Sequence, residues 1–107
     1  MTPDPTAGHP SAQLDEVVHQ RARLGILVVL AEAGTAEFTY LATRLGLTNG
    51  NLNRHLAVLE AAGLVEVDKR FEGRRPKTWL SMTPAGRGAL RREVATLRAI
   101  VDGVALP

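Results

Sequence analysis

Apolar residues recur at spacings of three and four over the first third of the chain, which is the period of an amphipathic helix. The pattern runs over residues 12–31, and Gly34 provides a stop signal. A more polar stretch at 19–23 indicates a short arm followed by a core helix. Residues 1–11 contain three prolines and almost nothing apolar, so we expect a flexible tail. The remainder, 12–107, is enough for one domain with a single core.

Two shorter helices are expected next, separated by a tight connection. After an extended stretch at 35–38, Thr39 can cap a helix of about two turns that ends at Gly46. Thr48 can cap a third helix, which runs to Gly63. Two helices joined in this way are typical of a helix-turn-helix unit.

The third predicted helix has one apolar face and one polar face. Its apolar face, expected in the core, consists of Leu52, Leu56 and Leu59. The opposite face is small and polar, with one long cation at its centre. Because Asn can pair with adenine and Arg with guanine, such a surface fits the major groove of DNA. The candidate DNA-reading residues are Thr48, Asn49, Gly50, Asn51, Asn53 and Arg54.

Gly50 lies in the first turn of this helix, where glycine costs about 0.5–1 kcal/mol relative to alanine. Close approach of DNA to the helix N-terminus would explain this residue, and the free N–H groups there favour phosphate. The alternative is that residues 49–51 only form a loose helix start.

Two stretches rich in strand-forming residues, 65–71 and 77–82, flank a polar tip at 72–76 and predict a β-hairpin. Phe71 and Trp79 are expected to pack on this hairpin rather than to stack on single-stranded bases. The stretch 69–77 holds five basic residues and one acidic residue, which leaves eight basic and ten acidic residues elsewhere. A concentrated basic stretch on an acidic body indicates a local anion contact. The candidate phosphate or minor-groove contacts are Arg70, Arg74, Arg75 and Lys77; the alternative is a solvated loop.

Thr83 followed by Pro84 is a strong helix start, and the last helix should continue to about Asp102. Its apolar residues recur at spacings of four and three, as in a coiled-coil seam. Such a helix is longer than one small domain needs, so we expect it, at about 84–104, to pair with a second copy. The alternative is that it folds back on its own domain. The candidate dimer interface is Leu14, Val17, Val18, Leu90, Val94, Leu97, Ile100, Val101 and Val104.

Other classes of function find little support in the sequence. The chain has no cysteine, which excludes disulfides and thiolate metal sites and favours the cytosol. His55 is expected to be packed or capped, and the three histidines show no metal-ligand spacing, so we assign no metal and no cofactor. No constellation of acid, base and nucleophile indicates an enzyme. The longest apolar run, 26–31, is too short to span a membrane.

The run from Arg23 to Ala89 resembles winged-helix regulators of the MarR and ArsR type, and most closely the small MarR-like group. The stretches GNLNRHLAVLEAAGLV and GRRPKTWLSMTPAGR carry the resemblance. It implies that the helix at 48–62 reads the major groove, that residues 71–77 form the wing, and that the terminal helices form the dimer. The ArsR metal sites and the peroxide-sensing MarR branch both use cysteine, which this chain lacks. Typical MarR members are longer and hold a phenolic ligand, so a small-molecule effector would be a further partner that this sequence does not identify.

Together these features predict a mainly helical α+β protein with a three-helix core, a β-hairpin wing and a long C-terminal dimerisation helix. We expect a regulator, acting as a repressor, that binds double-stranded DNA as a homodimer at an inverted repeat. The competing hypothesis is a winged-helix module for protein interaction, which would favour an apolar outer face on the third helix.

Overall fold

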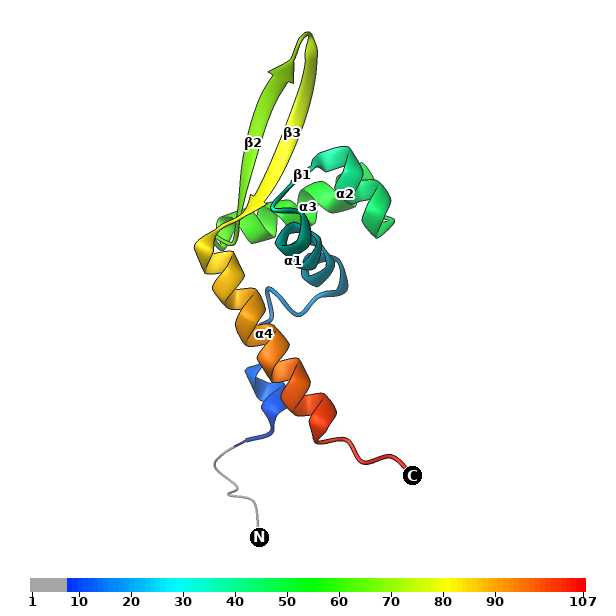
Figure 1. The fold of residues 1–107 in the computed structure, drawn as a ribbon, viewed down its shortest axis with the longest axis vertical. Coiled ribbons are helices and arrows are strands. Elements are labelled where there is room, and N and C mark those ends of the chain that lie inside the picture. The colour runs from blue at the N-terminus through cyan, green and yellow to red at the C-terminus, as the bar shows by residue number, and fades with distance from the viewer. Residues whose placement is uncertain (1–7) are drawn as a thin grey trace.

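The computed structural model describes residues 8–107, and its mainly helical α+β architecture confirms the predicted fold class. Three helices form a core from which a β-hairpin projects at one end and a long helix at the other (Figure 1). The elements follow in the order η1 (Pro10–Gln13), α1 (Arg21–Ala33), β1 (Thr35–Glu37), α2 (Phe38–Leu45), α3 (Asn49–Ala61), β2 (Val65–Glu72), β3 (Arg75–Met82) and α4 (Pro84–Asp102).

The hydrophobic core lies where α1, α2 and α3 meet the base of the hairpin. The apolar face predicted for the third helix is buried there, since Leu52, Leu56 and Leu59 all lie inside. Complete removal of such side chains from water stabilises a fold by about 1.5–3 kcal/mol each. The other large side chains that are fully buried in this core are Val18, Ile26, Leu27, Leu30, Leu41 and Leu80.

The sheet has three antiparallel strands in the order β1-β3-β2. β1 is short and pairs with residues 79–81 of β3, a pairing that the sequence pattern did not predict. β2 pairs with β3 along its whole length, from Val65 opposite Met82 to Glu72 opposite Arg75. The far half of the hairpin is therefore a free two-stranded ribbon.

The hairpin tip is tighter than predicted: the turn is only Gly73 and Arg74, and the strands continue through the rest of the expected 72–76 loop. Gly73 has a φ of +63°, as the first central residue of a two-residue hairpin turn requires. Pro76 lies inside β3, opposite Phe71. The strand tolerates this proline because β1 pairs only nearer the base, so β3 has an open edge there.

The start of the chain differs from the predicted helix. A 3-10 turn occupies Pro10–Gln13, and residues 14–20 form an irregular segment, which we call the N-terminal strap, before α1 begins at Arg21. Asp15 explains the break, because its carboxylate accepts bonds from the N–H groups of Val17 (2.8 Å) and Val18 (3.2 Å). Such local bonds compete with helix formation. Of the stretch 1–11 expected as a flexible tail, residues 1–7 lie outside the described residues.

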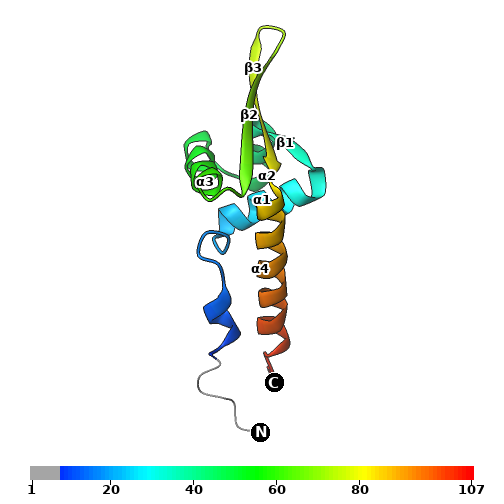
Figure 2. The same cartoon turned by 90° about the vertical axis from the view of Figure 1, so that its left-hand side faces the viewer.

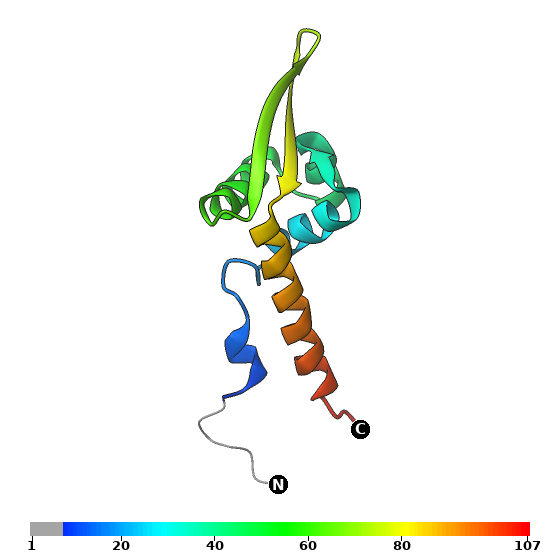
Figure 3. The same cartoon turned by 60° about the vertical axis from the view of Figure 1, so that its left-hand side comes forward.

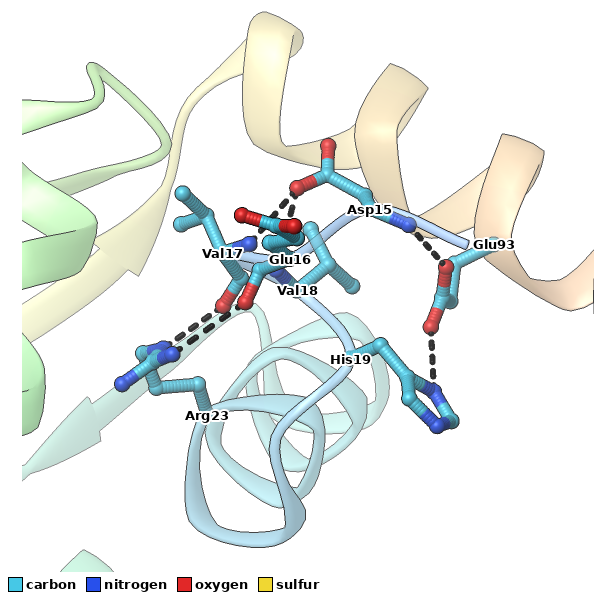
Figure 4. Close-up of polar contacts among 7 residues, drawn as sticks. All are labelled: Asp15, Glu16, Val17, Val18, His19, Arg23 and Glu93. Atoms are coloured by element: carbon cyan, nitrogen blue, oxygen red, sulfur yellow. Dashed lines mark hydrogen bonds and ion pairs between the residues drawn. The ribbon is translucent and has the colours of Figure 1, made fainter. Parts of the chain in front are cut away.

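The strap is fixed to α4 by a buried carboxylate (Figure 4). Glu93, only 2% exposed, accepts a 3.1 Å hydrogen bond from the N–H of Asp15, and its second oxygen lies 2.8 Å from His19 Nδ1. A buried carboxylate is costly unless it is paired in this way. The contact explains why α4 packs against the beginning of the chain.

Helix caps largely follow the sequence signals. Gly34 and Gly46, both with positive φ, end α1 and α2, and Thr83 caps α4 with a bond from the N–H of Gly86 (2.9 Å). One assignment was wrong: α2 is capped by Glu37, whose carboxylate accepts from the N–H of Tyr40, and not by Thr39. The earlier cap lengthens α2 by two residues and places it directly after β1.

Candidate nucleic-acid interface

The N-terminus of α3 is open and well capped. Thr48 Oγ1 accepts a 3.1 Å bond from the N–H of Asn51, as predicted. Thr48, Asn49 and Gly50 are all exposed, and a Cβ added at Gly50 would meet no other atom within 4 Å. The protein's own packing therefore does not require this glycine.

The outer face of α3 remains polar and accessible. Asn53 and Arg54 are exposed and Asn51 is half-buried. Arg54 donates a hydrogen bond of 2.5 Å from Nη2 to Asn51 Oδ1, which holds the guanidinium over the first turn of the helix. Four further donor hydrogens on Arg54 are left for a bound ligand.

His55 connects α3 to the N-terminal strap, and is half-buried as expected for a packed histidine. Its Nδ1 lies 3.2 Å from Nη1 of Arg23, whose Nε donates to the Val17 carbonyl (2.6 Å). Burial, followed by the charges of Arg23 and Arg54, lowers the pKa of His55 below its usual 6.5. The neutral ring can accept the Arg23 hydrogen bond, so α3 is held to the same strap that Glu93 holds to α4.

A groove of about 650 Å³ separates α3 from the hairpin. Figure 2 shows α3 to one side of the hairpin base, with the hairpin rising past it. Asn53 and Ala57 line the groove from α3, and Lys69 and Thr78 line it from the hairpin. Lys69 was not among the predicted contacts. The alternation of faces along a strand could have identified it, because Lys69 shares a face with Val67, which packs partly buried against the core.

The predicted wing cations divide into two groups. Arg70 lies 2.6 Å from Asp68, and Lys77 lies 2.9 Å from Glu72, which raises the pKa of Lys77 through a hydrogen bond and charge attraction. Since Arg70 and Lys77 are cross-strand partners next to Lys69 and Thr78, both lie on the face turned away from the groove.

Arg74 and Arg75 are both exposed at the tip of the hairpin. Within residues 8–107 the structure gives neither of them an acidic partner. They are the wing cations best placed to neutralise phosphate, whereas Arg70 packs instead over the Trp79 ring, 5.7 Å from its centroid. The Phe71 prediction was wrong: its side chain is 76% exposed and does not pack on the hairpin.

The predicted dimer residues occupy three kinds of position. Val18 and Leu90 are buried in the chain's own core, so their side chains are not available to a partner, and Val17 and Val94 pack against that core. Leu14, Leu97 and Ile100 are half-buried. Val101 and Val104 are exposed, at 67% and 55%. The C-terminal half of α4 runs clear of the three-helix core (Figure 3). This half keeps an apolar edge that includes Val94, Leu97 and Val101.

A helix-turn-helix followed by a β-hairpin wing places this chain in the winged helix-turn-helix class of DNA-binding regulators. The chain belongs to the winged helix DNA-binding domain family, whose profile matches residues 22–101. The resemblance to MarR-type regulators is confirmed by the solved structures that share this fold.

Three similar proteins illustrate the family. The protein MJ0432 of Methanocaldococcus jannaschii is 37% identical over 79 residues, which are 74% of this chain and 86% of that protein. A transcriptional regulator homologue from Pyrococcus horikoshii OT3 is 33% identical, with a TM-score of 0.82 over 90% of this chain and 95% of that one. NadR, solved in complex with 4-hydroxyphenylacetate, is 26% identical, with a TM-score of 0.66 over 87% and 68% of the two chains.

The family and fold are of a transcription-regulator type and not of an enzyme type. Among the described residues, no three His, Asp or Glu side chains are grouped so that they could hold a metal ion. No helix within residues 8–107 is both long enough and apolar enough to cross a membrane.

The Gly50→Ala substitution distinguishes the effect of Gly50 on the stability of the fold from its effect on DNA contact. Because the added methyl group meets nothing in the protein, we expect Gly50→Ala to raise the free energy of unfolding by about 0.5–1 kcal/mol. If DNA approaches the helix N-terminus closely, the same methyl group should weaken duplex binding. Chemical denaturation and gel-shift titration of one preparation measure both effects. If the DNA affinity is unchanged, DNA does not approach Gly50 closely, and this residue only forms part of a loose helix start.

Proposed function

We propose that this protein is a repressor that binds an inverted repeat in double-stranded DNA as a homodimer in the cytoplasm. The observation that carries the proposal is the joint placement of a polar α3 surface, with Asn53 and Arg54 exposed, beside a hairpin tip. That tip bears Arg74 and Arg75, which have no acidic partner among the described residues. In this arrangement α3 reads base edges in the major groove, and the wing tip contacts phosphate or the adjacent minor groove.

The direct DNA contacts divide by role. Thr48, Asn49 and Gly50 present the helix N-terminus to a phosphate, and Asn51, Asn53 and Arg54 face the bases. At the wing, Arg74 and Arg75 make the contacts, with Lys69 added from the groove. Arg70 and Lys77, already ion-paired on the far face, support the hairpin and add to its positive field.

The homodimer is supported by the apolar edge of α4. Leu97 and Val101, with Val94, Arg98 and Asp102, line a shallow groove of about 230 Å³, and nothing within residues 8–107 covers it. A second copy related by a two-fold axis would cover this edge and present the two α3 helices to major grooves about 34 Å apart. A repressor of this kind acts by occupying its operator.

A protein-interaction module receives less support. Such a role favours an apolar outer face on α3, whereas the observed face holds two asparagines and an arginine. NadR binds 4-hydroxyphenylacetate. A small-molecule effector of this chain would act on the DNA-binding dimer and would not replace its function.

Substitution of Arg54 and Arg74 tests the two roles separately. Arg54→Ala removes a base contact, so affinity for the preferred site should fall about tenfold while affinity for random duplex stays nearly constant. Arg74→Ala should weaken all sequences alike and reduce the salt slope by about 0.9 for the phosphate lost. Fluorescence anisotropy over a series of salt concentrations, with a selected site and a scrambled duplex, measures both. Equal effects of the two substitutions on both duplexes would contradict the proposed division of roles.

A further inference from the structure

One aromatic side chain near the end of the wing is exposed to solvent. Phe71 is 76% exposed although it is among the largest apolar residues of the chain, and its cross-strand partner Pro76 is exposed as well. Exposure of these two apolar residues to water does not stabilise the protein, and neither of them contacts the hydrophobic core. Isolated surface apolar residues are common, so the position of this pair must decide whether it has a role.

The register of the hairpin decides which way the pair faces. Cross-strand partners share a face and successive residues alternate, so Phe71 continues the row of Val67 and Lys69, and Pro76 continues the row of Leu80 and Thr78. Nearer the base these rows are buried or line the groove opposite α3. Phe71 and Pro76 thus extend the groove-lining face of the ribbon beyond the body of the protein.

The charges around the pair indicate its partner. The turn next to it carries Arg74 and Arg75, exposed and without acidic partners in the described chain, so the patch has an apolar centre and a cationic edge. A membrane or a protein partner could bind an apolar pair on either face of the ribbon, so neither partner explains why the pair lies on the face toward α3. A DNA minor groove offers both parts of the complementary surface, since deoxyribose walls are apolar and phosphates line their edges.

We propose that Phe71, with Pro76 beside it, is an apolar minor-groove contact that inserts between the sugar walls while Arg74 and Arg75 hold the flanking phosphates. The inference rests on the proposed DNA binding, and assigns the wing a contact that does not depend on charge. Phenylalanine and proline are residue types that proteins insert into minor grooves.

An apolar contact and an ionic contact respond differently to salt, which provides the test. Phe71→Ser should lower duplex affinity about tenfold at every salt concentration and leave the salt slope unchanged, because no phosphate contact is lost. Phe71→Leu, which keeps an apolar side chain, should retain most of the affinity. Arg74→Ala serves as the comparison, since it should change the slope.

Trp79 is the only tryptophan of the chain and lies in the hairpin, so its emission reports whether each variant keeps the wing folded. With unchanged emission and thermal unfolding, a parallel loss of affinity in Phe71→Ser supports the inference. Full affinity in Phe71→Ser, or a loss that comes with altered Trp79 emission, overturns it and leaves the proposed function standing. Failure of the unsubstituted protein to bind any duplex at low salt would instead remove the proposed function itself.

Discussion

Gly86→Ala is expected to lower the free energy of unfolding by about 2–3 kcal/mol, although alanine is normally the better helix residue. Gly86 is buried in the first turn of α4, where the helix crosses the chain between α3 and β2. A Cβ there would overlap the carbonyl oxygen of Leu64 and lie 2.8 Å from Met82 Cγ. The Leu64 oxygen also accepts the N–H of Thr83 (3.0 Å), so it cannot move without loss of that bond.

Gly88→Ala is the matched control on the same helix. Its added Cβ would meet only Nη1 of Arg92, at 3.4 Å, which is the end of a flexible side chain. We expect this variant to be stabilised by about 0.5–1 kcal/mol. Thermal unfolding at one protein concentration should show Tm about 10–20 °C lower for Gly86→Ala and slightly higher for Gly88→Ala. Equal Tm values for the two variants would show that α4 does not cross at the position described.

Leu97→Asp is expected to convert the proposed dimer to a folded monomer and to weaken binding to an inverted repeat on the order of 100-fold. Leu97 is half-buried on the apolar edge of α4 and does not pack into the core, so the monomer can tolerate a carboxylate there. At a two-fold interface the same carboxylate would be buried twice without a partner. A monomer has one α3 and one wing, and loses the second half-site.

Ala99→Asp carries the same charge on the opposite side of α4, where the side chain is exposed. This control should stay dimeric and bind DNA nearly normally. Sedimentation velocity gives the oligomeric state, and titration with one and two half-sites gives the affinity. A dimer that persists in Leu97→Asp would place the interface elsewhere on the molecule.

The sequence pattern was informative wherever a single local rule decides the structure. Thr48 and Thr83 precede helices because their hydroxyls satisfy N–H groups one turn ahead, and glycine ends α1 and α2 by adopting positive φ. The period of the leucines placed α3 correctly in the core. The polar outer face of α3 then followed, because the remaining positions of the helix must face outward.

The predictions made from the sequence were wrong where contacts between residues far apart in the chain determine the structure. The sequence predicts helix at the start of the chain, because the helical spacing of its apolar residues reveals neither the Asp15 bonds that break the helix nor the contact of the Asp15 N–H with Glu93, 78 residues away. Val18 was assigned to a dimer interface on helical spacing, but the irregular strap turns its side chain into the core. On the wing, the charge count identified the basic stretch, while the hairpin register and the ion pairs of Arg70 and Lys77 determined which cations remain available.

The most direct test of α3 and the wing as one DNA-binding surface is a hydroxyl-radical footprint on duplex enriched from genomic fragments by the protein. A dimer that binds through α3 and the wing should give an inverted repeat with two protected regions about one helical turn apart, and protection of the adjacent minor groove that is lost in Arg74→Ala. A footprint limited to one continuous half-site in the native protein, or no duplex binding at low salt, would contradict it.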